Sequence, residues 1–376
     1  MQTSEEPVGV AVVGCGVVSA QYLRNLGAFP DVRVVACADA DLARARAAAE
    51  RFAVPRCGDL DAVLTDPQVE LVVNLTPPAA HAGVALAAIE AGRHVYGEKP
   101  LALDRAACRR VLAAAAARGL RVGNAPDTVL CHPLRTVLGL LAEGAIGTPF
   151  AATTRACGPG PDTWHPDPAF FFRPGGGPLF DLGPYHLSAL VAALGPVARV
   201  AATAQQARSA RVIGNGPRAG ATFAVEVPTH VTALFEFAGG ASGSAQFSFD
   251  TPVDQHGPLV ICGTEGMIEA PDPNSYDGIV RYRRTGDGDW TVAPPAEPRP
   301  VGRGVGVLEL ARAIRSGAPH RASGEFALHV VDVMQAVTES ARSRRFSDVT
   351  SRFSAPRPLP ADWDPYAATL TAAVTR

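Results

Sequence analysis

The chain has 376 residues, of which 47% are hydrophobic and 19% charged, and its formal net charge is −2. These values are typical of a globular enzyme, and the length suggests two domains. The charge balance leaves no basic patch for nucleic acid and no acidic tail, so we expect no nucleic-acid partner.

The sequence shows neither the pattern of a secretory leader nor that of a membrane-spanning helix. The N-terminus is acidic and polar, the opposite of a secretory leader. The charge-free stretches 71–89 and 182–198 contain proline, histidine and other polar residues, unlike a spanning helix. The seven cysteines are scattered and lack Cys-x-x-Cys spacing, which favours reduced thiols. We therefore expect a cytoplasmic protein that does not bind membranes.

Residues 8–123 alternate between apolar strands and amphipathic helices. Strands are predicted at 8–13, 32–38, 70–75, 94–96 and 120–123, and helices at about 16–26, 41–52, 79–91 and 104–118. Continuously apolar strands that alternate with helices are typical of a parallel sheet covered on both faces. The first part of the chain is therefore predicted to be a doubly wound Rossmann domain that binds NAD(P).

The pattern changes after residue 125. A helix over 128–143, a strand over 149–156 and a helix that ends near 194 precede strands with period-two alternation, such as 231–237 and 244–249. Helices over 305–316 and 324–342 follow. The fold class is thus α/β, with a Rossmann domain at 1–125 and an α+β domain at 126–376. We expect the second domain to have a large, mostly antiparallel sheet and to bind substrate, and its C-terminal segment is able to pack back on the first domain.

A glycine-rich turn follows the first predicted strand. Gly14 permits the tight turn and Gly16 lets the backbone approach a pyrophosphate. Val17 and Val18 open the helix whose positive end would hold that group. The third position of the Gly-x-Gly-x-x-Gly pattern is Ser19, which we expect to loosen helix–strand packing slightly without loss of the phosphate contacts.

Asp39 ends the second predicted strand, at the usual place for a carboxylate that binds the adenosine ribose. Such a carboxylate would repel a 2′-phosphate, so it favours NAD over NADP. Arg44 lies one turn into the next helix, where it could reach a 2′-phosphate and so favour NADP. Asp41 is the better cap for that helix, which leaves Asp39 for the cofactor.

Polar residues follow the third clear strand, at the sheet edge where ligands bind. Asn74 and Thr76 are expected to expose polar groups there, and Pro77 with the next proline begins a helix. His81 falls on the first turn of that helix. It either flanks the cofactor or is a polar, partly exposed histidine.

Lys99 is the single lysine among the 34 lysine and arginine residues, and it follows a predicted strand in the sequence Gly97-Glu98-Lys99-Pro100. The other 33 of these positively charged residues are arginines, so surface charge in this chain does not require lysine. A guanidinium stays protonated, whereas an ammonium group is tuned by burial and by its neighbours. The position at the ligand edge of the sheet therefore favours a catalytic role, as a charge stabiliser more than as a Schiff-base nucleophile.

The dinucleotide turn, Glu98-Lys99-Pro100, the run from Gly175 to Gly183 and the turn Gly263-Thr264-Glu265-Gly266 together resemble the Gfo/Idh/MocA oxidoreductase family. This family includes glucose–fructose oxidoreductase and inositol dehydrogenases, and the resemblance covers nearly the whole chain. It implies that Glu98 and Lys99 belong to the cofactor site. It also implies a Lys99–Pro100 peptide that is often cis and aims the lysine at the nicotinamide, and an open sheet face that forms homodimers or homotetramers.

The family pattern Asp-x-x-x-His places a proton-relaying histidine four residues after an aspartate. Here Tyr185 stands four residues after Asp181, and histidine follows at His186. Some relatives use tyrosine, so the resemblance favours Tyr185 as proton donor and acceptor, assisted by Lys99, with His186 as the alternative. On a continuous helix Asp181 and Tyr185 would share a face, and Asp181 would orient a sugar hydroxyl or Lys99.

Further polar and aromatic residues are candidates for substrate binding. An aromatic face with nearby polar groups suits a sugar ring, which points to Trp164, His165 and Arg173; Trp164 packed into the core is the alternative. Asn124 and Asp127 follow the last strand of the first domain and are candidates to line the cleft. No His, Cys, Asp or Glu spacing indicates a metal site.

These observations predict an NAD(P)-dependent dehydrogenase or reductase that acts on a ring hydroxyl or ketone of a sugar, aminosugar or cyclitol. The alternatives are an NAD-dependent glycosidase or an aldose–aldose oxidoreductase that retains its cofactor, and a non-catalytic sugar and NAD sensor. NAD is the expected cofactor, with NADP open.

Overall fold

The computed structural model describes residues 6–296, 301–353, 358–360 and 362–370. The chain divides into two compact units that are each built from separate segments. Unit 1 comprises Met1–Cys131, Arg299–Leu328 and Pro356–Arg376, and unit 2 comprises His132–Pro298 and His329–Ala355. The segment that includes residues 305–316 therefore belongs to the same unit as residues 1–131.

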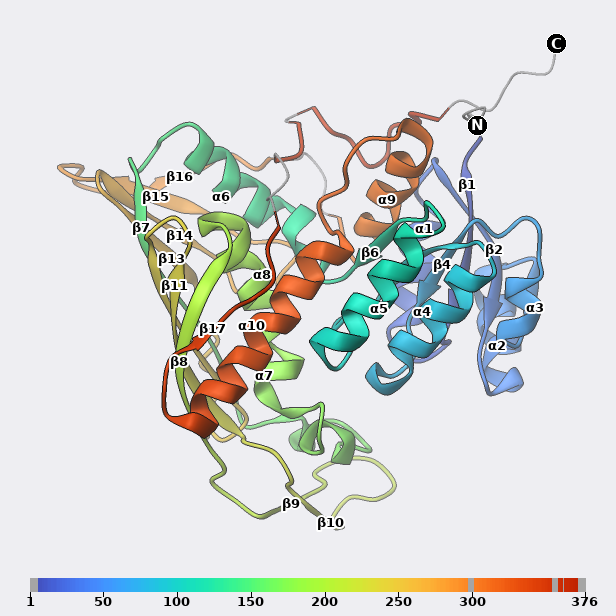
Figure 1. The fold of residues 1–376 in the computed structure, drawn as a ribbon, viewed down its shortest axis with the longest axis horizontal. Helices are drawn as coiled ribbons and strands as arrows, with labels where there is room; N and C mark the ends of the chain where they lie inside the picture. The colour runs from blue at the N-terminus through green and yellow to red at the C-terminus, as the bar shows by residue number, and fades with distance from the viewer. Residues whose placement is uncertain (1–5, 297–300, 354–357, 361, 371–376) are drawn as a thin grey trace. The chain divides into compact units, whose positions relative to one another are not determined.

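A six-stranded parallel sheet forms the centre of unit 1, in the order β3-β2-β1-β4-β5-β6 (Figure 1). The strands are β1 (Val8–Val13), β2 (Val32–Ala38), β3 (Arg56–Gly58), β4 (Leu71–Asn74), β5 (His94–Gly97) and β6 (Val122–Asn124). Every residue of β1 and β4 is buried, because helices cover both faces at the centre of the sheet. The doubly wound order predicted from the sequence is confirmed.

The described helices of unit 1 are α1 (Ser19–Leu26), α2 (Leu42–Phe52), α3 (Leu60–Leu64), η1 (Pro78–Ala80), α4 (His81–Glu90), α5 (Arg105–Ala116), η2 (Asp127–Leu130) and α9 (Val305–Ser316). Three of them begin at an aspartate cap. The carboxylates of Asp41, Asp59 and Asp104 accept main-chain N–H groups at the starts of α2, α3 and α5. The sequence analysis missed β3 and α3, since each is short and β3 is largely exposed.

Helix α9 is joined to the sheet by its arginines, although it lies far along the chain. Arg312 pairs with Asp31 at 2.7 Å and Arg315 pairs with Glu70 at 2.7 Å. The Asp31 carboxylate is fully buried, so its charge requires the guanidinium of Arg312 as a partner. Hydrogen bonds offset the cost of burial and hold the pKa of Asp31 below its usual value.

Unit 2 contains a nine-stranded sheet in the order β16-β15-β14-β13-β7-β12-β11-β8-β17. The strands are β7 (Pro149–Cys157), β8 (Val197–Gln205), β11 (His230–Phe237), β12 (Ser242–Ser248), β13 (Leu259–Gly263), β14 (Gly266–Ala270), β15 (Arg281–Arg284), β16 (Thr291–Val292) and β17 (Ser347–Asp348). Among the strands that the structure describes in this sheet, only β7 and β12 pair in parallel, so the expected mostly antiparallel sheet is confirmed. A separate hairpin joins β9 (Ala210–Val212) to β10 (Thr222–Ala224).

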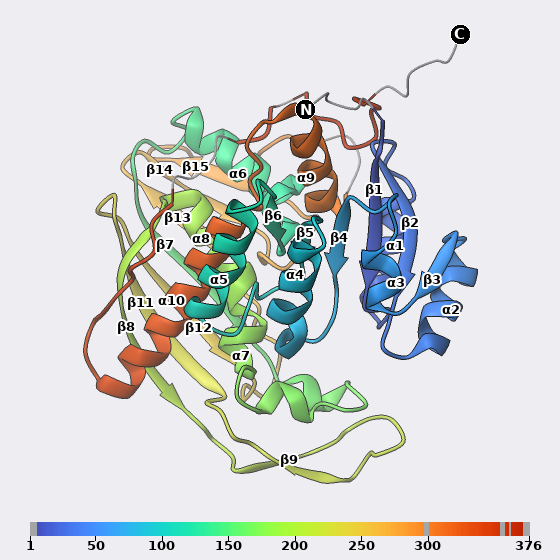
Figure 2. The same ribbon diagram turned by 45° about the vertical axis from the view of Figure 1, so that its right-hand side comes forward.

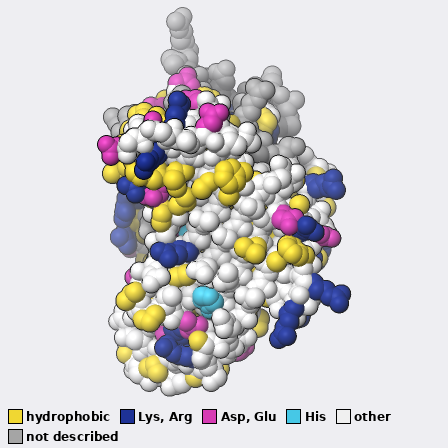
Figure 3. Space-filling model, turned by 90° about the vertical axis from the view of Figure 1, so that its left-hand side faces the viewer, with side chains coloured by type: hydrophobic (Ala, Val, Ile, Leu, Met, Phe, Trp, Pro, Cys, Tyr) yellow, Lys and Arg dark blue, Asp and Glu magenta, His cyan; other side chains and the backbone are white. Residues whose placement is uncertain are grey.

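Helices cover one face of the nine-stranded sheet. They include α6 (His132–Ala142), α7 (Gly177–Asp181), α8 (Gly183–Leu194) and α10 (Gly324–Ser343), and α8 and α10 lie against the same side in both views (Figures 1 and 2). Within the described residues the opposite face bears no helix, and Figure 3 shows hydrophobic side chains scattered over that side. Leu234 in β11 is 55% exposed on this surface, whereas the neighbouring Ala233 and Phe235 are buried. We call this surface the open face.

One predicted helix is interrupted in the structure. The sequence predicts a helix over 128–143, but η2 ends at Leu130, Cys131 is extended and α6 begins at His132. Pro133 explains the break, because it has no N–H group and its ring would clash with the preceding turn of a continuous helix. Proline is tolerated in the first turn of α6, where that N–H would have no intrahelical partner.

The seven cysteines are all free thiols, as expected from their spacing. In the described part of the chain, no helix combines the length and apolar character needed to cross a membrane.

Candidate active site

The turn between β1 and α1 has room for a phosphate group. Gly14 has φ of +100°, and a Cβ atom there would lie 2.7 Å from the main chain of Leu75, so only glycine fits. At Gly16 a Cβ atom would meet nothing within 4 Å, which leaves open space beside the first turn of α1. The neighbouring Val17 is 96% exposed. Open space at a helix N-terminus fits the pyrophosphate of a dinucleotide.

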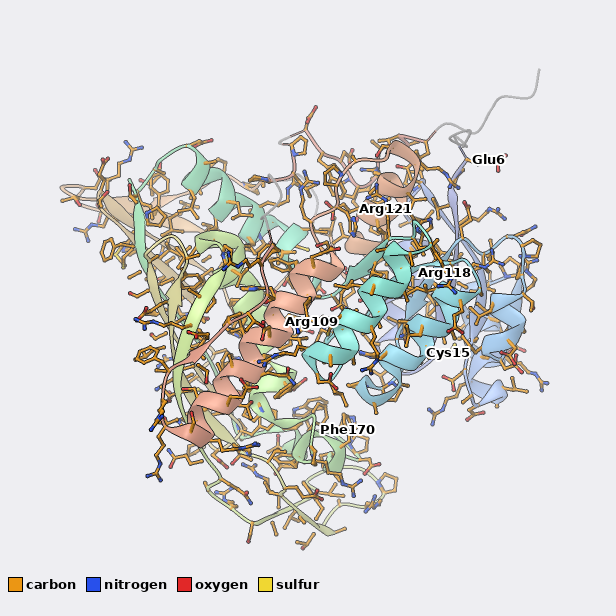
Figure 4. All side chains as sticks on the ribbon, viewed as in Figure 1. Glu6, Cys15, Arg109, Arg118, Arg121 and Phe170 are labelled. Carbon is orange, nitrogen blue, oxygen red and sulfur yellow. The ribbon has the colours of Figure 1, made fainter. Side chains whose placement is uncertain are left out.

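Asp39 holds this turn in place. Its carboxylate accepts the N–H of Cys15 at 2.7 Å and the N–H of Asp41 at 2.9 Å (Cys15 is labelled in Figure 4). Asp41 caps α2 through the N–H of Ala43, as predicted. Arg44 pairs with Asp41 at 3.4 Å on the surface, and its side chain is 65% exposed.

Ser19, the unusual third position of the fingerprint, is 3% exposed, and its hydroxyl donates to the carbonyl oxygen of Gly16 at 2.6 Å. The serine therefore adds a hydrogen bond within the turn.

Residues 97–100, which we call the lysine segment, are held through their main chain. The side-chain amide of Asn124 donates to the carbonyl oxygens of Gly97 and Glu98, both at 2.9 Å. The N–H of Glu98 donates to the carbonyl oxygen of Asn74 at 2.8 Å. The Lys99–Pro100 peptide is cis, as the resemblance implied. Lys99 itself is half-buried.

The Glu98 carboxylate binds protein groups on both of its oxygens. One oxygen accepts the hydroxyl of Tyr22 at 2.8 Å and lies 3.4 Å from the guanidinium of Arg303. The other accepts the N–H of Lys99 at 3.1 Å. Glu98, predicted to bind cofactor, thus anchors the lysine segment to α1 and to the segment before α9.

Asn74, Thr76 and His81 form a hydrogen-bonded group at the end of β4. Asn74 is 1% exposed, which corrects the expectation that it exposes a polar group. Its amide donates to the carbonyl oxygen of His81 at 3.0 Å, and its side-chain oxygen accepts the Thr76 hydroxyl at 2.6 Å. His81 is 2% exposed, so the alternative of a partly exposed histidine is wrong.

Two residues predicted to line the cleft are instead structural. Asn124 is buried and its amide is engaged by the lysine segment. Asp127 is fully buried, and its carboxylate accepts the N–H groups of Gly304 at 2.7 Å and Gly306 at 3.3 Å. Asp127 therefore caps the start of α9, where a carboxylate is favoured, and it has no surface to offer a substrate.

In unit 2, Asp181 and Tyr185 lie on two successive helices. Asp181 is the last residue of α7, and α8 starts at Gly183. Pro184 lacks the N–H that would continue α7, which ends the first helix and starts the second. The shared face expected of one continuous helix therefore does not apply. Tyr185 is 4% exposed and Asp181 is half-buried.

His186 belongs to a chain of polar side chains that we call the histidine array, formed by Thr154, His186, Asp272 and His256. Nδ1 of His186 lies 2.6 Å from the Thr154 hydroxyl, and Nε2 lies 3.3 Å from the Asp272 carboxylate, at ion-pair distance but without regular hydrogen-bond alignment. His186 has no exposed surface. This burial argues against the alternative in which His186 relays a proton directly to substrate.

The other oxygen of Asp272 lies 3.3 Å from Nδ1 of His256, which is partly exposed. Burial opposes the charged form of Asp272, but its contacts with His186 and His256 outweigh that effect and hold the pKa of this carboxyl well below its usual range. The contact with Asp272 in turn raises the pKa of His256. The sequence analysis missed Asp272 and His256, since nothing local in Pro271-Asp272-Pro273 indicates a contact with a helix far earlier in the chain.

An aromatic cluster precedes α7, around η3 (Pro161–Thr163) and η4 (Ala169–Phe172). Trp164 is 61% exposed, so its predicted alternative of packing into the core is wrong. Its ring centroid lies 5.4 Å from that of His165, and Phe170, labelled in Figure 4, lies 5.4 Å from His165 as well. Arg173 follows the cluster, with its side chain 63% exposed and 3.9 Å from Glu226.

Arg211 in β9 holds this aromatic loop and was also missed. Its guanidinium donates to the Asp162 carboxylate at 2.9 Å, contacts Asp250, and lies over the ring of Phe172 at 5.2 Å. The side chain of Arg211 is 2% exposed, so the paired carboxylates are required to compensate its buried charge.

Comparison with known proteins connects both halves of the chain to one family. Residues 8–125 match the model of the oxidoreductase family with an NAD-binding Rossmann fold, and residues 134–269 match the GFO/IDH/MocA C-terminal domain. An uncharacterized oxidoreductase, ORF334, from Rhizobium meliloti is 30% identical over 332 residues, which cover 85% of this chain and 92% of that protein.

Two further proteins are similar over most of the chain. Trans-1,2-dihydrobenzene-1,2-diol dehydrogenase from Bos taurus is 27% identical over 265 residues, which cover 70% of this chain and 73% of that enzyme. Levoglucosan dehydrogenase in complex with NADH and L-sorbose superimposes with a TM-score of 0.81 at 22% identity, over 92% of this chain and 100% of that one, which shows the same fold. The chain is an oxidoreductase of the GFO/IDH/MocA family, with an NAD-binding Rossmann domain followed by the family's C-terminal domain.

Proposed function

We propose that this oxidoreductase is an NAD-dependent dehydrogenase that oxidises a secondary hydroxyl on the ring of a sugar, aminosugar or cyclitol, or reduces the matching ketone. The observation that carries the proposal is the lysine segment, in which Asn124 holds the main chain of Gly97 and Glu98, the Glu98 carboxylate accepts the N–H of Lys99, and the single lysine stands in the middle. A lysine held in this way on the ligand edge of a parallel sheet suits charge stabilisation at a reacting oxygen.

The preference for NAD is supported by Asp39 and Arg44. A carboxylate at position 39 accepts hydrogen bonds from ribose hydroxyls and repels a 2′-phosphate. Arg44, the residue that would favour NADP, is paired with Asp41 on the surface. We expect kcat/KM with NAD to exceed that with NADP at least tenfold, measured by initial rates with each cofactor.

Each residue then has a defined task. When bound, the nicotinamide accepts or supplies the hydride. The Lys99 ammonium stabilises the negative charge that develops on the substrate oxygen. The Tyr185 phenolate accepts the hydroxyl proton during oxidation, and the phenol returns it during reduction. Asp181 orients a neighbouring hydroxyl. The exposed face of Trp164 stacks on the sugar ring, while His165 and Arg173 bind its hydroxyls.

The proposal is tested by absorbance at the NADH wavelength with a panel of inositols, pyranoses and cyclic diols. A steady rise that depends on both NAD and one of these alcohols is the expected result. Hydrolysis of a glycoside without NADH accumulation would instead indicate an NAD-dependent glycosidase. Transfer between two sugars without net NADH would indicate a retained cofactor. Binding of NAD and sugar without any turnover would indicate a sensor.

We also propose that the open face joins copies of the chain into a homodimer or homotetramer. Leu234 lies on that face opposite the small residues Ala201 and Ser244 of its two neighbouring strands. An apolar side chain among small ones suits a flat sheet-to-sheet contact. Light scattering should give at least twice the mass of one chain, and Leu234→Arg should lower that mass.

A further inference from the structure

His81 connects two loops at the ligand edge of the sheet in unit 1. Its Nδ1 atom lies 2.6 Å from the carbonyl oxygen of Pro100, and its Nε2 atom lies 2.8 Å from the carbonyl oxygen of Thr76. Thr76 follows β4, and Pro100 follows β5, the neighbouring strand. One buried ring therefore ties the end of β4 to the residue that comes directly after Lys99.

The chemistry of the two contacts defines what the ring must supply. A carbonyl oxygen accepts hydrogen bonds and donates none, so each contact is a hydrogen bond only when the facing ring nitrogen carries a hydrogen; a neutral imidazole supplies one such N–H and a protonated ring supplies both. A phenyl ring of similar size would fill the same space but would offer neither carbonyl oxygen a donor. The contacts at His81 thus depend on its nitrogen atoms as well as on its volume.

The main chain of His81 is also held. Asn74 donates its side-chain amide to the carbonyl oxygen of His81 at 3.0 Å and accepts the Thr76 hydroxyl on its other side-chain atom. The ring is therefore held at its own backbone as well as at its two nitrogens. Such preorganisation makes it a firm support for a neighbouring loop.

The lysine segment receives different support on its two sides. Before Lys99, Asn124 holds the carbonyl oxygens of Gly97 and Glu98. After Lys99, His81 holds the carbonyl oxygen of Pro100. We propose that His81 is a positioning residue for Lys99, which acts through the Pro100 carbonyl to hold the lysine main chain against the loop after β4. The kinetic consequence of this role rests on the proposed function of Lys99, but the positioning itself does not.

Two conservative substitutions separate the contacts. The amide nitrogen of asparagine takes the place of Nδ1, so His81→Asn keeps the contact to Pro100 and loses that to Thr76. The amide nitrogen of glutamine takes the place of Nε2, so His81→Gln does the reverse. We expect His81→Asn to keep kcat within about threefold, and His81→Gln and His81→Phe to lower kcat about 10- to 100-fold with little change in KM for NAD.

The single lysine allows a second readout that needs no substrate and no NAD. Reductive methylation with ¹³C-formaldehyde labels only Lys99 and the N-terminal amine, so the NMR spectrum of the intact protein contains one lysine resonance. The chemical shift and titration midpoint of that resonance should match the unsubstituted protein in His81→Asn and move in His81→Gln and His81→Phe.

His329 supplies the matched control. It is fully buried in α10, where Nε2 accepts the N–H of Val197 at 3.0 Å and Nδ1 lies 2.9 Å from the Ser351 hydroxyl. His329→Phe removes two buried contacts elsewhere and should leave the Lys99 resonance unmoved. A loss of general stability would therefore affect both histidine variants, whereas loss of positioning would affect only His81.

The outcomes decide between positioning and a merely structural role. Equal behaviour of His81→Asn and His81→Gln in both readouts, or an unmoved Lys99 resonance in His81→Gln, would overturn the proposal. If His81→Phe does not fold, the asparagine and glutamine pair still decides. If no tested alcohol is oxidised even by the unsubstituted chain, the proposed function fails, and the Lys99 resonance alone decides the role of His81.

Discussion

The lysine segment in unit 1 and the histidine array in unit 2 hold their reactive neighbours by different means. Around Lys99, the supporting groups are mostly amides and main-chain atoms, as with Asn124 and the carbonyl oxygens of Gly97 and Glu98. Beside Tyr185, the array joins side chain to side chain, and the Asp272 carboxylate lies between the rings of His186 and His256. The first arrangement fixes the position of the main chain at Lys99, whereas the second makes the stability of unit 2 depend on pH.

This difference has a consequence for mutation. A residue whose main chain is fixed can be changed at its side chain without loss of the support, so the effect appears in chemistry. A titratable array loses its balance of charge when one member changes, so the effect appears in stability. The predictions that follow test each half of this contrast.

The largest effect is expected at Lys99. Lys99→Arg keeps the positive charge and the main-chain anchors, but a guanidinium neither takes the place of a compact ammonium nor gives up its proton. We expect kcat to fall about 10²- to 10³-fold, with NAD affinity and thermal stability nearly unchanged. Initial rates, NAD titration and a melting curve measure this. Turnover within threefold of the unsubstituted enzyme would contradict the catalytic role.

A comparison of Tyr185 with His186 comes next. Tyr185→Phe removes the proposed proton carrier and should lower kcat about 100-fold. His186→Gln keeps a donor toward Asp272, so kcat should stay within about threefold, while unfolding in urea shows a loss of about 1–3 kcal/mol. The reverse order of the two effects on kcat would identify His186 as the relay.

The third prediction concerns acid stability in unit 1. Burial, followed by the nearby Arg121 guanidinium, lowers the pKa of His94 to about 4 from its ordinary value of 6.5. The unfolded chain therefore binds a proton first, and stability falls as pH drops from about 6.5 toward 4, by about 2–3 kcal/mol at most. The side-chain oxygen of asparagine can still accept the main-chain N–H of Arg121 but does not bind a proton in this pH range. His94→Asn should therefore reduce the loss of stability between pH 7 and pH 5, as measured by urea unfolding at the two pH values. An unchanged loss would assign the acid sensitivity elsewhere.

The smallest effect is expected in the array and has the opposite direction. Because the Asp272 carboxylate raises the pKa of His256, the stabilisation is complete below the unfolded value near 6.5 and is lost as pH rises through the folded value. Asp272→Asn removes this contribution. The difference in unfolding free energy between the unsubstituted protein and Asp272→Asn should therefore be larger at pH 6 than at pH 9. An equal difference at both pH values would mean that Asp272 does not stabilise the charged form of His256.

Much of the fold followed from local signals in the sequence. Alternating apolar strands and helices predicted the parallel sheet, and the helix bounds 305–316 agree with α9. Errors arose where a single proline or a short element decided the outcome, as at Pro133 and in β3. A three-residue strand has no period of its own, so only tertiary pairing specifies it.

Gly14 carried its meaning locally, because its φ of +100° is the tight turn that the sequence predicts. Asp39 and Lys99 were selected by similar local signals, and their roles stay predictions. The candidate site was not predictable where a polar residue satisfies a distant main-chain group. Asp127 looked like a cleft residue because it follows a strand, but it caps a helix 177 residues later in the chain. No pattern near Asp127 contains that information, because the partner is set by how the chain returns to unit 1.

The arginines of α9 also set an order of events during synthesis. Asp31 meets Arg312 281 residues later, and Glu70 meets Arg315 245 residues later. On the ribosome, both carboxylates therefore emerge long before the cations that pair with them. The cofactor-binding unit reaches its full complement of ion pairs only after all of unit 2 up to residue 298 has been translated, and a chain that ends before residue 312 lacks both of the arginines that pair with these carboxylates.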